Sequence, residues 1–531
     1  MSKVLNWLGS AKTKGAGFSF LSLGNMLIAF ITYLRFAEIA RIFGTTWQTD
    51  AVSIAMVIPL LLQQLISTAF SSAFMPIYSR VRLNQGNDAA NRLISRIINW
   101  MSLTGVVFIG LVLASGSLAI RIVGPGIEPS TTILATKLLW VFLPLIFLNA
   151  IEGVLQNFLN YGKRYGLVSF VRVLQILVSY LVIICGHGKF GVMIIPVSGL
   201  IGAFVSFFVC ALITFRLNLR LRLVLDPGNR DFKELVRLAV PIIIGTLTGF
   251  LGPVADKALA SFLRASSVTA IDYASRIKNL IRMVLIQPVL ILSAVSFSRI
   301  AAEKNLTKLK GEIASFIKYI SYYTVPASGI LMVLSVPLIS ILFQRGNFGP
   351  EESRRIGYTL AFYSPWFAQL GIGRIVDRAF YSLKETITPV VLGIWCVLAN
   401  ILLNVILLQP LGIYGLALAT TLTSGAKTLF LMYFLRKKLG GINGSDFVPE
   451  YLKFLFSAAV MIGYLLLSSR LFPVDLNTAL SERIFKLSLS IVPGIIIYVA
   501  ITALVGSKTF GIYLDMVKRI LLSGKKKLHG S

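Results

Sequence analysis

Long apolar stretches recur along the whole of this 531-residue chain, and they constrain its fold more than any other feature. A helix needs about 20 mostly apolar residues to cross the hydrocarbon core of a bilayer. Hydrophobic residues make up 56% of the sequence and charged residues only 14%, so a soluble protein of this length would lack polar surface to cover its core. The sequence therefore predicts an all-α polytopic membrane protein.

The apolar stretches predict about 14 transmembrane helices. They cover residues 17–36, 48–76, 97–122, 131–158, 165–186, 191–215, 235–262, 268–298, 314–343, 355–381, 387–409, 412–435, 451–471 and 485–506. Lys and Arg concentrate in every second connection, as around Arg80, Arg220 and Arg436, whereas the intervening connections are short or sparsely basic. Because cytoplasmic loops are enriched in Lys and Arg, this alternation predicts that both termini lie in the cytoplasm.

The same alternation accounts for most of the formal net charge of +30. A further role of the basic residues in attracting an anionic substrate stays open, and a nucleic-acid partner is not favoured. Cys185, Cys210 and Cys396 lie without CxxC spacing, which indicates neither a disulfide framework nor a zinc site. The sequence lacks GxSxG, HExxH and Walker A motifs. We therefore expect a transporter without a catalytic constellation, a metal or a cofactor.

A weak internal repeat divides the chain. Residues 35–50 read RFAEIARIFGTTWQTD and residues 257–272 read KALASFLRASSVTAID, so that Asp50 and Asp272 are 222 residues apart (272 − 50). Inverted or parallel repeats are common in transporters that rock two halves around a central site. The repeat predicts two six-helix lobes followed by two C-terminal helices. The predicted boundaries are 1–225, 226–440 and 441–531, the last part including a basic cytoplasmic tail.

Charged side chains within the apolar segments are candidates for function, because they are costly in a membrane unless they face a cavity or one another. They are Arg35, Asp50, Glu152, Arg172, Asp256, Lys257, Asp272, Arg276, Lys278, Arg282, Lys318, Arg374, Asp377 and Arg378. The surplus of basic residues suits an anionic cargo such as a diphosphate. Arg35 and Arg276 are the favoured cavity residues. Snorkelling of side chains towards the span ends remains the alternative for about half of the set.

Two asparagines four residues apart, Asn400 and Asn404, lie on one face of a predicted helix, and Thr420 and Thr421 follow in the next span. Amide and hydroxyl oxygens, together with one carboxylate, could bind a hard monovalent cation. Hydrogen bonding between the helices is the other interpretation of the same residues, and the sequence favours it.

Several ordered motifs resemble the MurJ/MviN family of lipid II flippases. They are Ala40–Gly44 (ARIFG), Thr49–Ala51 (TDA), Ile58–Pro59, Ala69–Pro76 (AFSSAFMP), Asp256–Ser261 (DKALAS), Asp272–Arg276 (DYASR), Phe343–Phe348 (FQRGNF) and Arg378–Pro389 (RAFYSLKETITP). The resemblance covers nearly the whole chain. It implies a fourteen-helix flippase of the multidrug/oligosaccharidyl-lipid/polysaccharide exporter superfamily. Two lobes would enclose a cavity, and the last two helices would accept a polyprenyl tail.

The resemblance also implies site residues. Arg35, Asp50 and Arg276 match functional positions of the family. Some positively charged residues of the family are absent from this chain. Arg172, Lys278 and Arg282 are hypothetical replacements for their charge. A sodium site described in some members corresponds to Asp256, Asn400, Asn404, the Leu416 carbonyl and Thr420. Those members have aspartate at the position of Asn404, so sodium coupling here would have one fewer negative charge.

This chain departs from the family pattern at several charged positions. The family has arginine at Ala29, aspartate at Phe36, two arginines near Gln63–Gln64, glutamate near Thr68 and aspartate at Ser275. These departures leave two cargoes open. The first is lipid II, the undecaprenyl-diphosphate-linked peptidoglycan precursor, moved from the inner to the outer leaflet of a bacterial cytoplasmic (inner) membrane by alternating access. The alternative is a paralogous flippase for another polyprenyl-diphosphate-linked oligosaccharide.

Two further classes are not favoured. A basic cavity would repel the cationic substrates of a drug antiporter, and a membrane-embedded glycosyltransferase would need a catalytic base and a large extracytoplasmic loop. The expected partners are the lipid-linked glycan and membrane lipids, without nucleic acid, and a monomer is expected to suffice for transport.

Overall fold

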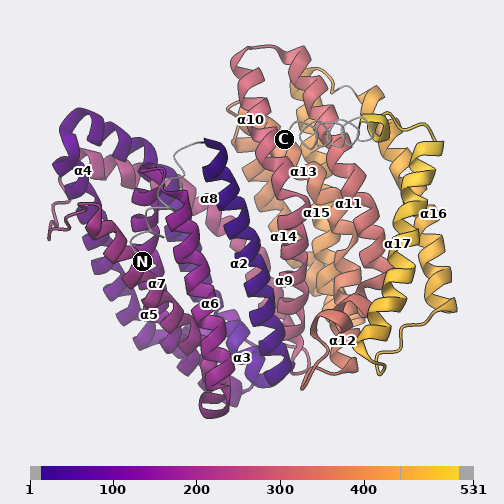
Figure 1. Ribbon diagram of the computed structural model, residues 1–531, viewed down its shortest axis with the longest axis horizontal. Helices are drawn as coiled ribbons and strands as arrows, with labels where there is room; N and C mark the ends of the chain where they lie inside the picture. The colour runs from indigo at the N-terminus through magenta and orange to yellow at the C-terminus, as the bar shows by residue number, and fades with distance from the viewer. Residues whose placement is uncertain (1–13, 443, 513–531) are drawn as a thin grey trace, which may run out of the picture. The chain divides into compact units, whose positions relative to one another are not determined.

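The computed structural model describes residues 14–442 and 444–512, and within these ranges the regular secondary structure is entirely helical (Figure 1). The N-terminal helices are α2 (Lys14–Phe43), α3 (Trp47–Ala55), α4 (Val57–Val123), α5 (Pro129–Tyr161), α6 (Tyr165–Phe190), the 3-10 turn η1 (Gly191–Met193), α7 (Ile194–Arg216) and α8 (Arg230–Ala260). The remaining helices are α9 (Ser267–Leu285), α10 (Gln287–Ala302), α11 (Leu306–Phe343), α12 (Pro350–Tyr363), α13 (Pro365–Ser382), α14 (Ile387–Leu411), α15 (Ile413–Leu439), α16 (Gly444–Leu471) and α17 (Leu480–Leu504).

Glycine and proline set the breaks within these helices. In α4, Gly86 has φ +84° and ψ −179°, a conformation that only glycine adopts readily, so the helix breaks at this residue, which lies between the predicted spans 48–76 and 97–122. Helices α9 and α10 together match one predicted span and bend by 48° at their junction. Pro288 lies in the first turn of α10 and lacks the N–H that a continuous helix would need there.

All fourteen predicted apolar segments coincide with helical residues, which confirms the all-α membrane fold. Among the described residues, eight helices are long and apolar enough to cross a membrane, or up to nine if the bent pair of α9 and α10 is one span. The predicted number of fourteen therefore stays a prediction.

The chain forms two compact units. The first unit comprises residues 1–269 with 345–348, and the second comprises residues 270–344 with 349–531. Helix α8 is grouped with the first unit because it packs along α4, where Arg80 donates to Asp231 at 3.0 Å and to Glu234 at 2.7 Å. This division by packing differs from the predicted boundary at residue 225. The three predicted parts describe repeated lobes, and that repeat assignment stays a prediction.

Each unit has its own apolar core. In the first unit, Phe74 and Tyr78 of α4 stack with ring centroids 5.0 Å apart and are nearly completely buried with residues of α5 and α6. In the second unit, Phe454 of α16 and Tyr498 of α17 pack around Tyr322 of α11, and the Tyr498 hydroxyl donates to the Tyr322 carbonyl at 3.1 Å. The last two helices are therefore attached to the second unit through α11.

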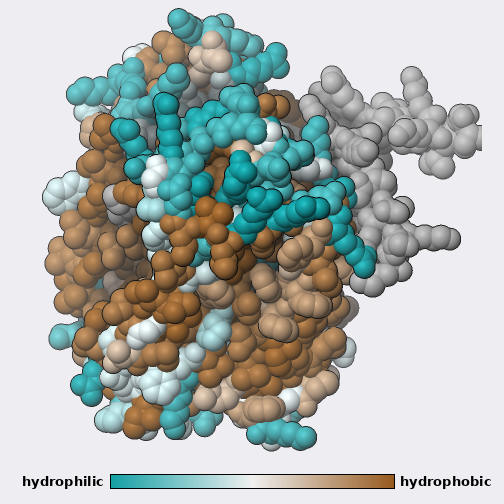
Figure 2. Space-filling model, turned by 90° about the vertical axis from the view of Figure 1, so that its left-hand side faces the viewer, coloured by the Kyte–Doolittle hydropathy of each residue, from teal (hydrophilic) through white to brown (hydrophobic). Residues whose placement is uncertain are grey.

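The surface is largely apolar along the helices. Figure 2 shows one face on which hydrophobic residues form a broad band, with hydrophilic residues gathered above it and a few below it. The second half of α4 contributes exposed large hydrophobic residues, among them Val106, Val107, Leu111, Leu118 and Ile122. Such a band is the surface that a bilayer would cover, since monomeric soluble proteins rarely expose apolar patches of this extent.

Candidate transport site

Asp50 lies in the first turn of α3 and is 5% exposed. The turn that precedes it is fixed by a capping box, in which Thr49 Oγ1 accepts a 2.8 Å hydrogen bond from the Thr46 amide and Thr46 Oγ1 accepts one of 3.4 Å from the Thr49 amide. This local sequence, TTWQTD, therefore starts the helix and determines where the Asp50 carboxylate points.

The Asp50 carboxylate holds the beginning of α9. Its oxygens accept hydrogen bonds from the Ser266 amide at 2.5 Å, the Thr269 amide at 2.7 Å and the Thr269 hydroxyl at 2.6 Å. These donors belong to the first unit, just before the chain passes to the second unit at residue 270. Charge-assisted hydrogen bonds from an N-terminal helical turn are among the stronger ones in proteins. The geometry therefore gives Asp50 an anchoring role, and its predicted contact with substrate stays a prediction.

A second anchor holds the segment of residues 345–348, which also belongs to the first unit. The Asn347 amide donates to the Arg41 carbonyl at 2.9 Å, and Asn347 Nδ2 donates to the Ile42 carbonyl at 2.6 Å. Gly44 and Gly346 both have φ +58°, and a Cβ on either would lie 2.4 Å from a backbone oxygen of the opposite segment. The ARIFG and FQRGNF motifs therefore meet, which gives a physical reason for both glycines.

Arg35 and Arg172 both belong to the first unit but lie at different levels. Helices α2 and α6 run in the same direction, because a Cβ on Gly24 would touch Ser169 while Arg41 lies near Tyr180. Arg35 is eleven residues after Gly24 and Arg172 is three residues after Ser169, a difference of about 12 Å along the helices. Arg35 is half-buried and Arg172 exposed. The two arginines are therefore not brought to one point.

Arg172 instead joins a polar network in the core of the first unit. Its Nε donates to Gln156 Oε1 at 2.8 Å, and Gln156 Nε2 donates to Glu152 Oε1 at 2.8 Å. The hydroxyl of Ser206 donates to Glu152 Oε2 at 2.6 Å. Glu152 is only 2% exposed, so these neutral donors and the nearby guanidinium compensate a carboxylate buried in a membrane span. Sequence reasoning noted Glu152 but missed the network.

Arg276 lies on α9 within the second unit and pairs with a residue of its own helix. Its Nε donates to Asp272 Oδ2 at 2.7 Å, one turn earlier, and its side chain is 26% exposed. A guanidinium carries several N–H donors in a fixed planar arrangement that suits phosphate oxygens. Arg276 thus keeps the chemistry that its predicted substrate contact requires.

The two other predicted cationic replacements in the second unit differ from each other. Lys278 is 9% exposed, and its ammonium lies 3.9 Å from the ring centroid of Tyr363 and 4.7 Å from that of Trp366. This aromatic enclosure satisfies the charge by cation–π contacts. Arg282 instead lies close enough to Arg374 for their charges to repel, so this pair concentrates positive charge within the unit. Arg282 is therefore the better replacement.

Four of the five tentative cation ligands form a continuous hydrogen-bonded chain in the second unit. Asn404 Nδ2 donates to Asn400 Oδ1 at 3.3 Å, and Asn400 Nδ2 donates to Thr420 Oγ1 at 3.4 Å. The Thr420 hydroxyl donates to the Leu416 carbonyl at 3.1 Å. Of these contacts only the one between Asn400 and Thr420 joins two helices, α14 and α15, and it is the kind of interhelical hydrogen bond that the sequence favoured. The fifth residue, Asp256, is buried on α8 of the first unit. Across the described ranges, no cluster of three or more His, Cys, Asp or Glu residues could hold a metal.

The comparisons with known proteins decide the family. The family model for "Lipid II flippase MurJ" matches residues 39–484. This chain belongs to the lipid II flippase MurJ family. It is 25% identical over 441 residues to a probable lipid II flippase MurJ of Buchnera aphidicola subsp. Acyrthosiphon pisum, covering 81% of this chain and 85% of the relative. It is 24% identical to the lipid II flippase MurJ of Thermosipho africanus, covering 92% of this chain and 94% of the relative.

Solved structures of low identity agree on the fold. A structure of lipid II flippase MurJ in an inward closed conformation matches with a TM-score of 0.77 and 23% identity, covering 94% of this chain and 99% of the other. An inward-facing multidrug resistance MATE family transporter of the MOP superfamily matches with a TM-score of 0.67 and 17% identity, covering 77% and 94%. The fold of this multi-pass membrane protein is thus that of a transporter.

Proposed function

We propose that this MurJ family member moves lipid II from the inner to the outer leaflet of the bacterial cytoplasmic membrane. The observation that carries the proposal is the family match over residues 39–484, together with the use that the structure makes of the matching motifs. Asp50 and Asn347 anchor the points at which the chain passes out of the first unit, and Arg276 presents a partly exposed guanidinium in the second. The alternative cargo, another polyprenyl-diphosphate-linked oligosaccharide, is not favoured by the named relatives.

The residues suit a diphosphate cargo. Arg35 and Arg276 would donate to phosphate oxygens, where bidentate arginine contacts are stronger than those of lysine. The hydrogen bond from Arg276 to Asp272 joins two residues of one helix, and a diphosphate would compete with the Asp272 carboxylate for the same guanidinium. Arg282 beside Arg374 would add to the attraction. Transport by alternating access would then need no chemical step on the cargo, and no enzymatic activity is proposed.

We propose that the membrane potential drives the return of the empty transporter to the conformation that accepts cargo. Moving one charge across 100 mV changes the free energy by about 2.3 kcal/mol, which is enough to favour one conformation. A sodium ion at Asp256, Asn400, Asn404, Leu416 and Thr420 remains a proposal for coupling. We also propose that both termini face the cytoplasm, as the distribution of basic loops supports. We further propose that a monomer suffices for transport and that nucleic acid is not a partner.

Complementation tests the cargo. In a cell whose own lipid II flippase can be depleted, expression of this chain should restore growth and the exposure of lipid II on the outer face. A second strain, which depends on a flippase for a different polyprenyl-diphosphate-linked glycan, should not be rescued. Rescue of only the second strain by a well-expressed chain would contradict the proposal and support the alternative cargo.

A further inference from the structure

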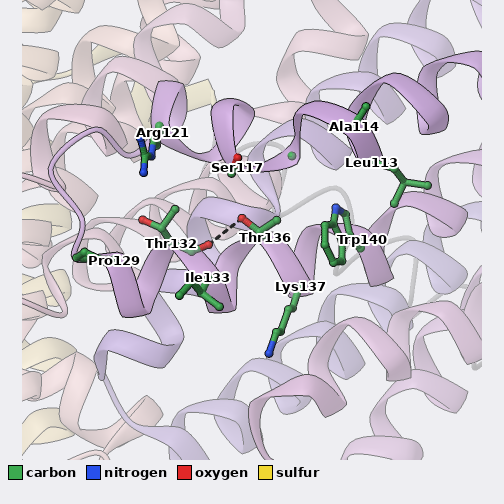
Figure 3. A pocket seen from close by; sticks show the side chains of 11 residues that line it. Leu113, Ala114, Ser117, Arg121, Pro129, Thr132, Ile133, Thr136, Lys137 and Trp140 are labelled. Atoms are coloured by element: carbon green, nitrogen blue, oxygen red, sulfur yellow. Dashed lines mark hydrogen bonds between the residues drawn. The ribbon is translucent and has the colours of Figure 1, made fainter.

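A pocket of about 480 Å³ lies in the first unit between the second half of α4 and the start of α5 (Figure 3). None of the candidate transport residues described above is among its lining residues. Figure 3 shows Ser117 and Arg121 on α4 across from Thr132, Ile133 and Trp140 on α5. The pocket is therefore formed by one face of each helix.

Helical spacing explains why these residues share the pocket. On α4, Leu113, Ser117 and Arg121 follow at intervals of four, and on α5 the series Pro129, Ile133 and Lys137 has the same interval. Gly116 leaves the space between the helices open, because a Cβ there would lie 2.9 Å from Trp140 Nε1.

The charge of the pocket is positive. Arg121 and Lys137 line it, both are exposed, and no acidic side chain is among its lining residues. In the described part of the chain, neither of these two residues forms an ion pair with a carboxylate. The hydroxyls of Thr132 and Thr136 donate to backbone carbonyls. Arg121, Lys137 and Ser117 thus remain the donors for an occupant.

The surroundings of the pocket are apolar. Leu118, Ile122 and Ile133 are each at least 60% exposed, and Trp140 is 43% exposed. Arg121 is in the last turn of α4, whereas Lys137 is eight residues into α5, about 12 Å from its start. Exposed aliphatic residues beside a tryptophan, with long basic side chains that can extend towards the headgroups, are typical of the boundary between acyl chains and headgroups.

We propose that this pocket binds an anionic phospholipid of the surrounding bilayer. Arg121 and Lys137 would hold the phosphate, and the acyl chains would lie along the exposed apolar residues of α4 and α5. Charge complementarity favours this occupant over a zwitterionic lipid, and the continuity of the pocket with the apolar surface favours a lipid over a soluble anion. The site would tie the first unit to anionic lipid independently of the transported cargo.

Trp140 allows a direct test in the full-length protein. The chain is placed in nanodiscs that contain brominated phosphatidylglycerol or brominated phosphatidylcholine, and the quenching of Trp140 is obtained by subtracting the signal of Trp140→Phe. Six tryptophans are present, and this subtraction isolates the one in the pocket. We expect phosphatidylglycerol to occupy the pocket at least about fivefold more strongly than phosphatidylcholine, since one basic residue near a membrane surface attracts anionic lipid by about that factor.

Variants test whether the preference for phosphatidylglycerol comes from the pocket or from the many basic residues elsewhere in the protein. The double variant Arg121→Gln/Lys137→Gln should lose the preference, whereas the control Lys189→Gln, an exposed lysine outside the pocket, should retain it. Ala114→Leu keeps both charges but fills the pocket, and it should reduce quenching by both lipids. Equal quenching by the two lipids in the unmodified protein, or a preference that persists in a folded double variant, would overturn the proposal.

Discussion

Asp50 in the first unit and Asp272 in the second occupy equivalent places in the internal repeat, yet they have different partners. Asp50 accepts hydrogen bonds from Ser266 and Thr269 at the beginning of α9, whereas Asp272 accepts a hydrogen bond from Arg276 on its own helix. The backbone before each aspartate is similar, since Gly44 and Ser266, also 222 residues apart (266 − 44), have φ +58° and +69°. The turns before the two aspartates are therefore alike in φ, whereas the hydrogen-bond partners of the two carboxylates differ.

This difference distinguishes the anchoring role of Asp50 from the proposed binding of cargo by Arg276, the partner of Asp272. The Asp50 carboxylate is buried and its oxygens are occupied, so it stabilises the first unit. Asp272 accepts a hydrogen bond from an arginine whose side chain is partly exposed. We expect substitutions at the two places to affect stability and transport in different proportions.

The largest effect is expected for Asp50→Ala. The change would leave two backbone amides and one hydroxyl without their acceptor, and each hydrogen bond to a charged group contributes about 1.5–3 kcal/mol. We therefore expect a loss of at least about 3 kcal/mol in stability, together with loss of transport. The measurement is thermal unfolding of the purified protein alongside complementation. The control Asp88→Ala removes an exposed carboxylate of the same unit and should change neither the melting temperature nor complementation. An unaltered melting temperature in Asp50→Ala would contradict the anchoring role.

Arg276→Ala should reduce transport without a matching loss of stability. Its bond to Asp272 joins residues of one helix, while a lost contact with a diphosphate would lower transport by at least about tenfold. The measurement is lipid II exposure in depleted cells, with the melting temperature of the same variant. Arg299→Ala, whose side chain is 80% exposed, is the control. Transport at the normal rate by Arg276→Ala would remove this residue from the cargo site.

Gly44→Ala tests the second anchor. A Cβ would lie 2.4 Å from the Asn347 carbonyl oxygen in addition to the strain of φ +58°, so we expect a loss of about 2–3 kcal/mol. Gly440 has a similar φ, +64°, in the ordinary left-handed region with ψ +36°, but nothing lies within 4 Å of its Cβ position. Gly440→Ala should therefore cost only about 1 kcal/mol, from backbone strain alone. Equal destabilisation of the two variants in thermal unfolding would show that the contact with Asn347 is unimportant.

Arg172→Gln should have a smaller effect on transport than Arg276→Ala. Glu152 would keep its hydrogen bonds from Gln156 and Ser206, and the exposed guanidinium would be the main loss. Interactions of exposed charges contribute about 0–1 kcal/mol, which corresponds to at most about fivefold in transport. Transport assays of the two variants at equal expression would compare them. A larger loss for Arg172→Gln would move the cargo site into the first unit.

The smallest expected effect is a pH dependence at the α4–α8 contact. Hydrogen bonding to Arg80 lowers the pKa of Glu234 below its usual value. Because the folded-state pKa is depressed, the stabilisation is present above the unfolded value, about 4.3, and is lost as the pH falls through the lower folded value. Thermal unfolding of Glu234→Gln and the unmodified chain should thus differ near neutral pH and converge in acid. A difference that grows on acidification would contradict the pairing.

The sequence was sufficient to predict the helical segments, the membrane class and the family. Apolar length determines where helices form, and the ordered motifs determine the relatives. Side-chain partners could not be obtained in this way, because they depend on which helices pack together. For Asp50 the sequence predicted a contact with substrate, which stays a prediction, but it did not reveal the hydrogen bonds to the start of α9. Lys278 was a candidate cationic replacement, whereas Tyr363 and Trp366 enclose it.

The pocket between α4 and α5 was not predicted either. Arg121 and Lys137 are sixteen residues apart and belong to different helices, so only the packing around Gly116 brings them to one pocket. The spacing of four residues placed Asn400 and Asn404 on one helix face, and the polar residues of the next span favoured a hydrogen bond between helices, as Asn400 forms with Thr420. Local patterns therefore predicted contacts along one helix better than contacts across distant segments.

Reconstitution tests the central claim most directly. The purified chain is placed in vesicles that carry lipid II in both leaflets, a membrane potential is imposed, and an impermeant enzyme that cleaves the diphosphate linkage reports the accessible fraction over time. We predict that lipid II of the inner leaflet becomes accessible with the unmodified chain and with Arg299→Ala, but not with Arg276→Ala. If only the outer leaflet is ever cleaved, while a different polyprenyl-diphosphate-linked oligosaccharide crosses in the same vesicles, the chain is not a lipid II flippase.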